Sequence, residues 1–164
     1  MTVVIEPGDF AAVEVNRDGP NRCSPPPQGD DWRGIAIRGP SRLRVPRGLG
    51  YDALTATIPI CGFYRFSLDA LDGKGAMRLV AVDQASGAVF SGAVVDLDPS
   101  PVLPEPDLGP VRRERLIGRA VGSHFNPNLT DFVRLPPRAA SYAVHVEFCG
   151  HRSNPVAIDV VEEP

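Results

Sequence analysis

The chain has 164 residues, of which 43% are hydrophobic and 23% charged, and this is enough for one globular domain over residues 1–164. Its net charge of -3 argues against general attraction to nucleic acids or anionic membranes. All apolar runs are far shorter than the ~20 residues of a transmembrane helix, and "MTVVIEPGDF" lacks the basic and apolar regions of a signal peptide. We therefore expect a cytoplasmic protein. The preference for Arg over Lys indicates a GC-rich bacterial genome.

Short alternating apolar segments separated by Gly and Pro dominate the chain, and no long segment has the period of an amphipathic helix. Many short strands between turns are typical of a β-sandwich or barrel. The pattern predicts strands near residues 3–5, 10–15, 35–38, 43–45, 54–58, 63–68, 77–82, 89–95, 116–121, 132–135, 142–148 and 156–161.

Two proline-rich segments predict long loops. They are "RDGPNRCSPPPQGDD" (17–31) and "DPSPVLPEPDLGP" (98–110). Proline lacks the N–H group that a sheet ladder needs, so neither segment fits a central strand. "VAVDQASGAVFSG" (80–92), in contrast, predicts a β-hairpin whose turn runs from Asp83 to Gly87.

Residues 142–148 alternate in polarity, which places Tyr142, Val144 and Val146 in the core and His145 in water or at an edge. A proline-containing turn, a Tyr that opens the penultimate strand and a final "SNPVAIDVV" resemble the end of immunoglobulin-like and fibronectin type III-like domains. The resemblance covers about 30 residues and implies an all-β, antiparallel immunoglobulin-like sandwich with additional strands. It also implies that the Tyr142 hydroxyl bonds upstream backbone, but it implies no function.

Cys23, Cys61 and Cys149 are odd in number and widely spaced, so we expect three reduced thiols. Cys61, Cys149, His124 and His151 have the chemistry of zinc ligands. No two of these residues have the spacing that anchors a zinc site. The sequence therefore predicts neither a metal nor another cofactor, and "Cys-Gly-His" at 149–151 is interpreted as a hairpin turn.

A catalytic pair of Cys149 with His151, or of Cys61 with His145, lacks an accompanying glycine motif for an oxyanion site. The acidic residues are scattered over loops and ends and suggest no paired carboxylates for glycoside hydrolysis. The protein is therefore predicted not to be an enzyme.

The candidate binding residues are Arg38, Arg42 and Arg44, which lie in a stretch without acids between Trp32 and Asp52. Strand alternation would place the three side chains on one exposed sheet face that attracts an acidic protein. The alternative is that they are solvated or paired with acids of neighbouring strands. "VRRERLIGR" (111–119) is a second basic segment with the same two explanations.

The function predicted is that of a non-catalytic binding or assembly domain, which recognises another protein through a sheet face or end loops. The alternative is a carbohydrate-binding or protease-inhibitor-like module. An exposed aromatic cluster would favour sugars, although aromatics are only 7% of the chain. "NPNLTDF" (126–132) resembles the Asn-Pro-Thr-Thr-Gly motif of chagasin-like inhibitors, but it lacks the glycine.

Overall fold

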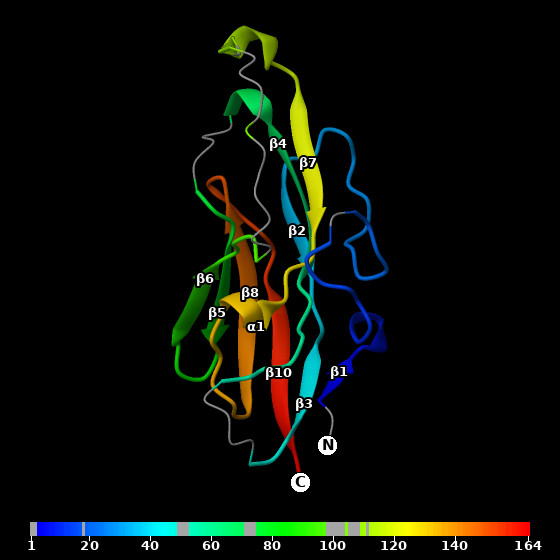
Figure 1. Ribbon diagram of the computed structural model, residues 1–164, viewed down its shortest axis with the longest axis vertical. Helices are drawn as coiled ribbons and strands as arrows, with labels where there is room; N and C mark the ends of the chain where they lie inside the picture. The colour runs from blue at the N-terminus through cyan, green and yellow to red at the C-terminus, as the bar shows by residue number, and fades with distance from the viewer. Residues whose placement is uncertain are drawn as a thin grey trace.

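The computed structural model describes residues 3–17, 19–48, 53–70, 75–97, 104, 109–110 and 112–164, and it is built mainly from β-strands (Figure 1). The strands are β1 (Val4–Glu6), β2 (Gly34–Arg38), β3 (Arg42–Pro46), β4 (Cys61–Ser67), β5 (Arg78–Asp83), β6 (Val89–Ala93), β7 (Ala120–Phe125), β8 (Ala140–Phe148), β9 (His151–Arg152) and β10 (Val156–Glu163). Short helices are η1 (Gly8–Phe10), η2 (Leu68–Ala70), η3 (Arg113–Arg115) and α1 (Leu129–Phe132). The predicted all-β class is confirmed.

The strands form two sheets. The large sheet has the order β1-β3-β10-β8-β5-β6, with β9 added to β8, and the small sheet has the order β2-β4-β7. In Figure 1 the small sheet reaches the upper end of the molecule, whereas both termini lie at the lower end. The prediction of purely antiparallel pairing was wrong at one place, because β10 runs parallel to β3.

One hydrophobic core joins the two sheets. Ile35 and Phe66 of the small sheet belong to the same buried cluster as Leu79, Val144 and Val146 of the large sheet. Alternate side chains of β8 point into this cluster, as the sequence predicted. The core is therefore an apolar layer to which both sheets contribute.

Three predicted strands are absent. Phe10 ends η1, and the residues from 11 to 15 form turns and bends. Residues 54–58 form no strand, because their backbone groups bond to partners other than a neighbouring strand. Ile58 N, for example, donates to the Asn128 Oδ1 atom at 2.8 Å. Of residues 132–135, Phe132 ends α1 and the other three follow it. The side chain of Asn128 caps the first turn of α1 by accepting from Thr130 N. The strand expected over 116–121 begins later, at Ala120.

The prediction for His145 was also wrong. Its side chain is buried, and its Nε2 atom lies 3.0 Å from Glu147 Oε1 and 2.9 Å from Arg152 Nη2. The cause is β9, which pairs with the end of β8 and brings Arg152 beside Glu147. The hydrogen bond to His145 lowers the pKa of Glu147 below its ordinary value. The alternation of the sequence correctly predicted which residues of β8 share a face. It did not predict that Glu147 and Arg152 would bury the side chain of His145 on the outer face.

The hairpin of β5 and β6 is confirmed. Gly87 has a φ of 73° in the turn, a backbone conformation that residues with a Cβ atom rarely adopt. Asp83 Oδ1 accepts from the backbone N–H groups of Ala85 and Ser86 at 2.8 and 3.2 Å. Because these bonds favour the ionised carboxylate, they lower the pKa of Asp83 below its ordinary value.

Tyr142 departs from the resemblance at its hydroxyl. The Tyr142 side chain is buried, and its Oη atom has no hydrogen-bond partner among the described residues. Burial raises the pKa of Tyr142 above its ordinary value, and the nearby Asp83 carboxylate adds to that effect. The tyrosine therefore stabilises the core by packing, including an edge-on contact with Phe90 whose ring centroid is 6.2 Å away.

Truncation of Val146 tests the core. Val146→Ala removes fully buried methyl groups and leaves a cavity, so we expect the free energy of unfolding to fall by about 1–3 kcal/mol. The control is Val89→Ala on β6, where the side chain is 63% exposed and the change should stay within about 0.5 kcal/mol. Chemical denaturation measures both values, and equal losses would contradict the proposed core.

Acid titration of stability tests the Asp83 turn. A carboxylate whose pKa is lowered by folding stabilises the protein above its unfolded pKa and loses that contribution as the pH falls through its folded pKa. Asp83→Asn keeps an oxygen acceptor but cannot titrate. We expect the wild-type protein to lose stability relative to this variant between about pH 5 and about pH 2. Parallel acid limbs in the two denaturation series would show that Asp83 contributes nothing.

Candidate functional site

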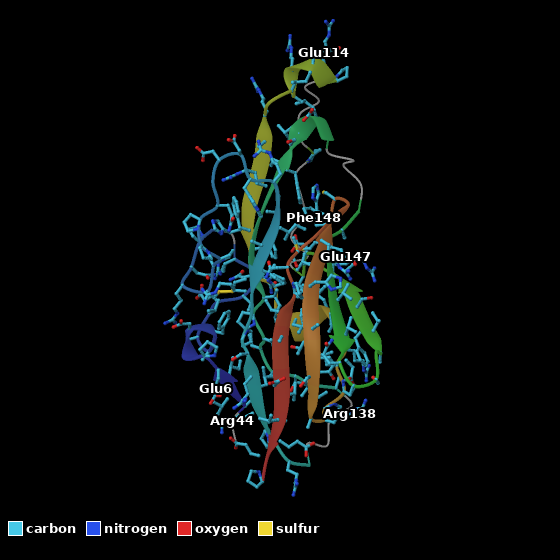
Figure 2. The ribbon with its side chains drawn as sticks, turned by 180° about the vertical axis from the view of Figure 1, so that it is seen from behind. Glu6, Arg44, Glu114, Arg138, Glu147 and Phe148 are labelled. Carbon is cyan, nitrogen blue, oxygen red and sulfur yellow. A yellow bond between two sulfur atoms is a disulfide. The ribbon has the colours of Figure 1, made fainter. Side chains whose placement is uncertain are left out.

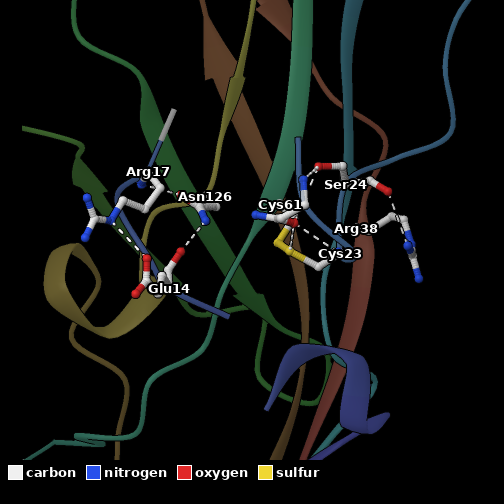
Figure 3. The surroundings of a disulfide bond; sticks show 8 residues. Glu14, Arg17, Cys23, Ser24, Arg38, Cys61 and Asn126 are labelled. Atoms are coloured by element: carbon white, nitrogen blue, oxygen red, sulfur yellow. Dashed lines mark hydrogen bonds and ion pairs between the residues drawn. A yellow bond between two sulfur atoms is a disulfide. The ribbon is translucent and has the colours of Figure 1, made fainter. Parts of the chain in front are cut away.

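The segment of residues 19–31, here called the proline loop, lies on the outer face of the small sheet. A disulfide joins Cys23 of this loop to Cys61 of β4, with the two Cα atoms 5.8 Å apart and both side chains buried (Figure 3). The expectation of three thiols was therefore wrong. The two cysteines are separated by 38 positions, and only the docking of the loop on β4 brings them together.

Hydrogen bonds hold the loop at further points. Arg38 Nη1 of β2 donates to the Ser24 carbonyl at 3.3 Å, and Arg65 Nη1 of β4 donates to the Gly29 carbonyl at 2.7 Å. Just before the loop, the buried Asn126 amide donates to the Glu14 carbonyl and accepts from Arg17 N at 2.7 Å (Figure 3). The loop is thus held by β2 and β4, and the residues that lead into it are held by Asn126, which follows β7.

A pocket of about 460 Å³ lies between the proline loop and the sheet, and we call it the loop pocket. Its sheet side is formed by Phe63 and Arg65 of β4 and by His124 of β7. The loop contributes polar side chains, among them Gln28, and four prolines: Pro20, Pro25, Pro26 and Pro27. Proline rings make this wall both apolar and stiff.

Phe63 is the centre of the sheet side. Its ring centroid lies 6.2 Å from that of Trp32 and 4.8 Å from that of His124, and the Arg65 Cζ atom lies 5.2 Å from it. An added Cβ atom at Gly122 of the neighbouring strand would come within 2.7 Å of the Tyr64 carbonyl oxygen and within 3.1 Å of Phe63 Cζ. Glycine at this position therefore lets both the β4 backbone and the aromatic ring lie close to β7.

The loop pocket also contains polar groups suited to recognition. The His124 Nδ1 atom is buried and has no hydrogen-bond partner within the described part of the chain. This nitrogen has almost no exposed surface, so the groups that can orient a ligand in the aromatic pocket are the Arg65 guanidinium and the polar side chains of the loop.

The three predicted arginines do not share a face of one sheet. Arg38 lies in β2 of the small sheet, where it supports the proline loop and stacks over Phe10 at 5.5 Å from the ring centroid. Arg42 and Arg44 lie in β3 of the large sheet, and Arg44 Nε is 3.0 Å from Glu6 Oε1 (Figure 2). The chain crosses between the sheets in residues 39–41, so alternation cannot be continued across this proline-containing bend.

Cys149 and Gly150 form the turn between β8 and β9, as predicted, and His151 is the first residue of β9. Cys149 itself takes a φ of 50° and is half-buried in the turn, instead of ending a core strand. The His151 ring stacks on Phe66 with a centroid distance of 4.7 Å, so it contributes to packing at the end of the core. The disulfide removes Cys61 from the zinc and thiolate chemistry considered above.

Comparisons with protein-family models, curated proteins and solved structures find no match to this chain. Over the described residues, no helix is both long and apolar enough to cross a membrane.

A thiol count tests the disulfide. Denatured, unreduced protein should give one reactive thiol per chain, that of Cys149, because Cys23 and Cys61 are joined. Changing both joined residues to Ser should lower the free energy of unfolding by about 2–4 kcal/mol, since the cross-link restricts the unfolded chain. Cys149→Ser is the matched control. It should remove the one reactive thiol but leave the disulfide, and its contribution to the free energy of unfolding, unchanged. Three thiols in the wild-type protein would contradict the disulfide.

Proposed function

We propose that this chain is a non-catalytic binding domain that recognises another protein through the loop pocket. The observation that carries the proposal is a pre-formed, mainly apolar pocket whose sheet side combines Phe63, His124 and Arg65. Binding sites are usually concave and apolar, with a few polar groups that orient the ligand. Aromatic residues and arginine are also enriched among the residues that dominate protein interfaces.

The tethers of the proline loop support this proposal. A loop held by a disulfide and by several hydrogen bonds loses little conformational entropy when it binds. Polar loops without such bonds lose much of their binding energy to ordering. The arrangement therefore favours recognition by a rigid surface, and the predicted binding by a sheet face and an end loop becomes one site.

The disulfide bears on the compartment. Structural disulfides persist in oxidising environments and are rare in the cytosol. The expectation of a cytoplasmic protein depended in part on reduced cysteines, and Cys23–Cys61 removes that support. We infer an oxidising compartment instead. The immunoglobulin-like assignment of the sandwich is likewise a proposal, supported by two sheets around one core and by the terminal hairpin pattern.

Carbohydrate binding is the second candidate, because Trp32, Phe63 and His124 form an aromatic cluster outside the main core. Such a cluster offers flat apolar faces to a sugar ring. The protease-inhibitor alternative gains no support from "NPNLTDF". Asn126, Asn128 and Leu129 are buried, and both asparagines bond to neighbouring backbone.

Site-specific photo-crosslinking tests the proposed function. A photo-reactive residue at position 28, in the wall of the loop pocket, should capture a discrete partner protein from an extract of the native host. The same residue at exposed Gln84, in the β5–β6 turn, is the control and should not capture it.

Two variants sharpen this result. Phe63→Ala should abolish capture from position 28, whereas the double change Arg42→Gln and Arg44→Gln should leave it intact. Equal capture from positions 28 and 84 would contradict the loop pocket as a protein-binding site. Binding to an immobilised glycan panel, lost in Phe63→Ala, would favour the carbohydrate alternative.

A further inference from the structure

Among the described residues, no strand pairs with the outer edge of β7, which lies beside the loop pocket. β7 is an outer strand of the small sheet, six residues long, and Ala120, Val121 and Gly122 are exposed. The strand contains no charged residue and no proline. Natural sheets commonly protect their edges with such residues, because an unpaired edge is a template for another strand.

The pairing register shows which backbone groups face outward. Leu68 N donates to the Arg119 carbonyl at 2.9 Å, so odd-numbered residues of β7 bond to β4. The N–H groups of Ala120, Gly122 and His124 consequently point away from β4. Among the described residues, none bonds these three N–H groups, although the Ser123 hydroxyl donates to the His124 carbonyl at 3.1 Å.

The opposite edge of the same sheet is capped at its centre. Asn154 donates from Nδ2 to the Ile37 carbonyl at 3.0 Å and accepts from Ile37 N at 2.9 Å. One side chain thus satisfies the outward donor and acceptor of Ile37, as a neighbouring strand would. Within the described part of the chain, no side chain caps the outward N–H groups of β7 in this way.

The open edge and the loop pocket adjoin at His124. The His124 side chain lines the pocket, while its backbone N–H faces the open edge. The described bonds between the proline loop and the sheet go to β2 and β4, and the bonds near β7 go to Asn126, beyond the end of the strand. A strand placed along β7 therefore has alternate side chains beside the row formed by Phe63 and His124.

The charge at the start of β7 is positive. Residues 112–119 contain four arginines and one glutamate, and Arg112, Arg115 and Arg119 are exposed. This end lies at the top of the molecule, where Figure 2 labels Glu114. Exposed arginines of this kind attract carboxylates and orient an approaching segment.

We propose that β7 accepts an extended, acidic segment of the partner protein as an added β-strand, which inserts an apolar side chain into the loop pocket. The proposal rests on the proposed function and names its ligand. Main-chain hydrogen bonds to Ala120, Gly122 and His124 supply affinity, and the loop pocket together with the arginines supplies selectivity.

The probe is a displayed library of random linear peptides, selected against the folded protein. Selected sequences should combine acidic residues with an apolar residue, and their affinity should fall as salt concentration rises. Ala120→Pro removes one outward N–H group, and it should weaken a selected peptide by about tenfold or more in fluorescence polarisation. The matched control, Val89→Pro, makes the same change at the first residue of β6 and should leave affinity unchanged.

Backbone methylation of the peptide gives an independent measurement that does not depend on the folding of Ala120→Pro. N-methyl groups on one alternate set of peptide amides should abolish binding, and those on the other set should be tolerated, because an added strand uses one edge only. A library without binders, or peptides insensitive to both methylated sets and to Ala120→Pro, would overturn the proposal. A dimer in sedimentation velocity that Ala120→Pro dissociates would also overturn it, since a second copy would then occupy the edge.

Phe63→Ala separates this inference from the proposed function. Peptides that lose affinity in Phe63→Ala but keep it in Ala120→Pro would show that the loop pocket binds without strand addition. In that case the proposed function survives and the inference fails. Peptides that keep their affinity for Phe63→Ala but lose it for Ala120→Pro would show that the loop pocket makes no contact. That result would overturn the role of the pocket in both the proposed function and this inference.

Discussion

Burial of one face of β8 is the constraint on which the structure depends. Tyr142, Val144 and Val146 are almost fully buried, and β8 pairs with β5 on one side and with β10 on the other. Through this face the large sheet contacts the small sheet, whose apolar face would otherwise be exposed to water. The position of β4 and β7, and with it the loop pocket, follows from that packing.

The proline loop is held in place by other interactions than the core. It is rich in proline and polar residues, so burial of its side chains contributes little to holding it in place. The Cys23–Cys61 disulfide and hydrogen bonds from Arg38 and Arg65 hold it instead. These contacts leave a cavity beneath the loop because proline rings and backbone do not fill the space above Phe63. The proposed binding surface thus lies where the hydrophobic core ends and where the disulfide and hydrogen bonds hold the loop instead.

The arginines illustrate how position changes the meaning of a charged residue. Arg38 bonds the proline loop, Arg44 pairs with Glu6, and Arg42 lies in register with Glu6 and Asp159 of the adjoining strands. This agrees with the alternative that the strand arginines pair with neighbouring acids. The basic segment before β7 adjoins a strand edge that no described strand pairs with. Its positive charge is therefore placed to attract an acidic segment in the proposed interaction.

The sequence by itself determined the all-β class, the two faces of β8, the β5–β6 hairpin and the turn at Cys149, because alternation and turn chemistry are local. Only the tertiary structure decided the disulfide, the burial of His145 and the separation of Arg38 from Arg44. Each depends on segments far apart in the chain that meet when the sheets pack. The sheet residues of the loop pocket were missed for the same reason, although the loop itself was predicted. Phe63 and Arg65 alternate with the core residue Phe66, yet nothing local showed that a loop lies over them.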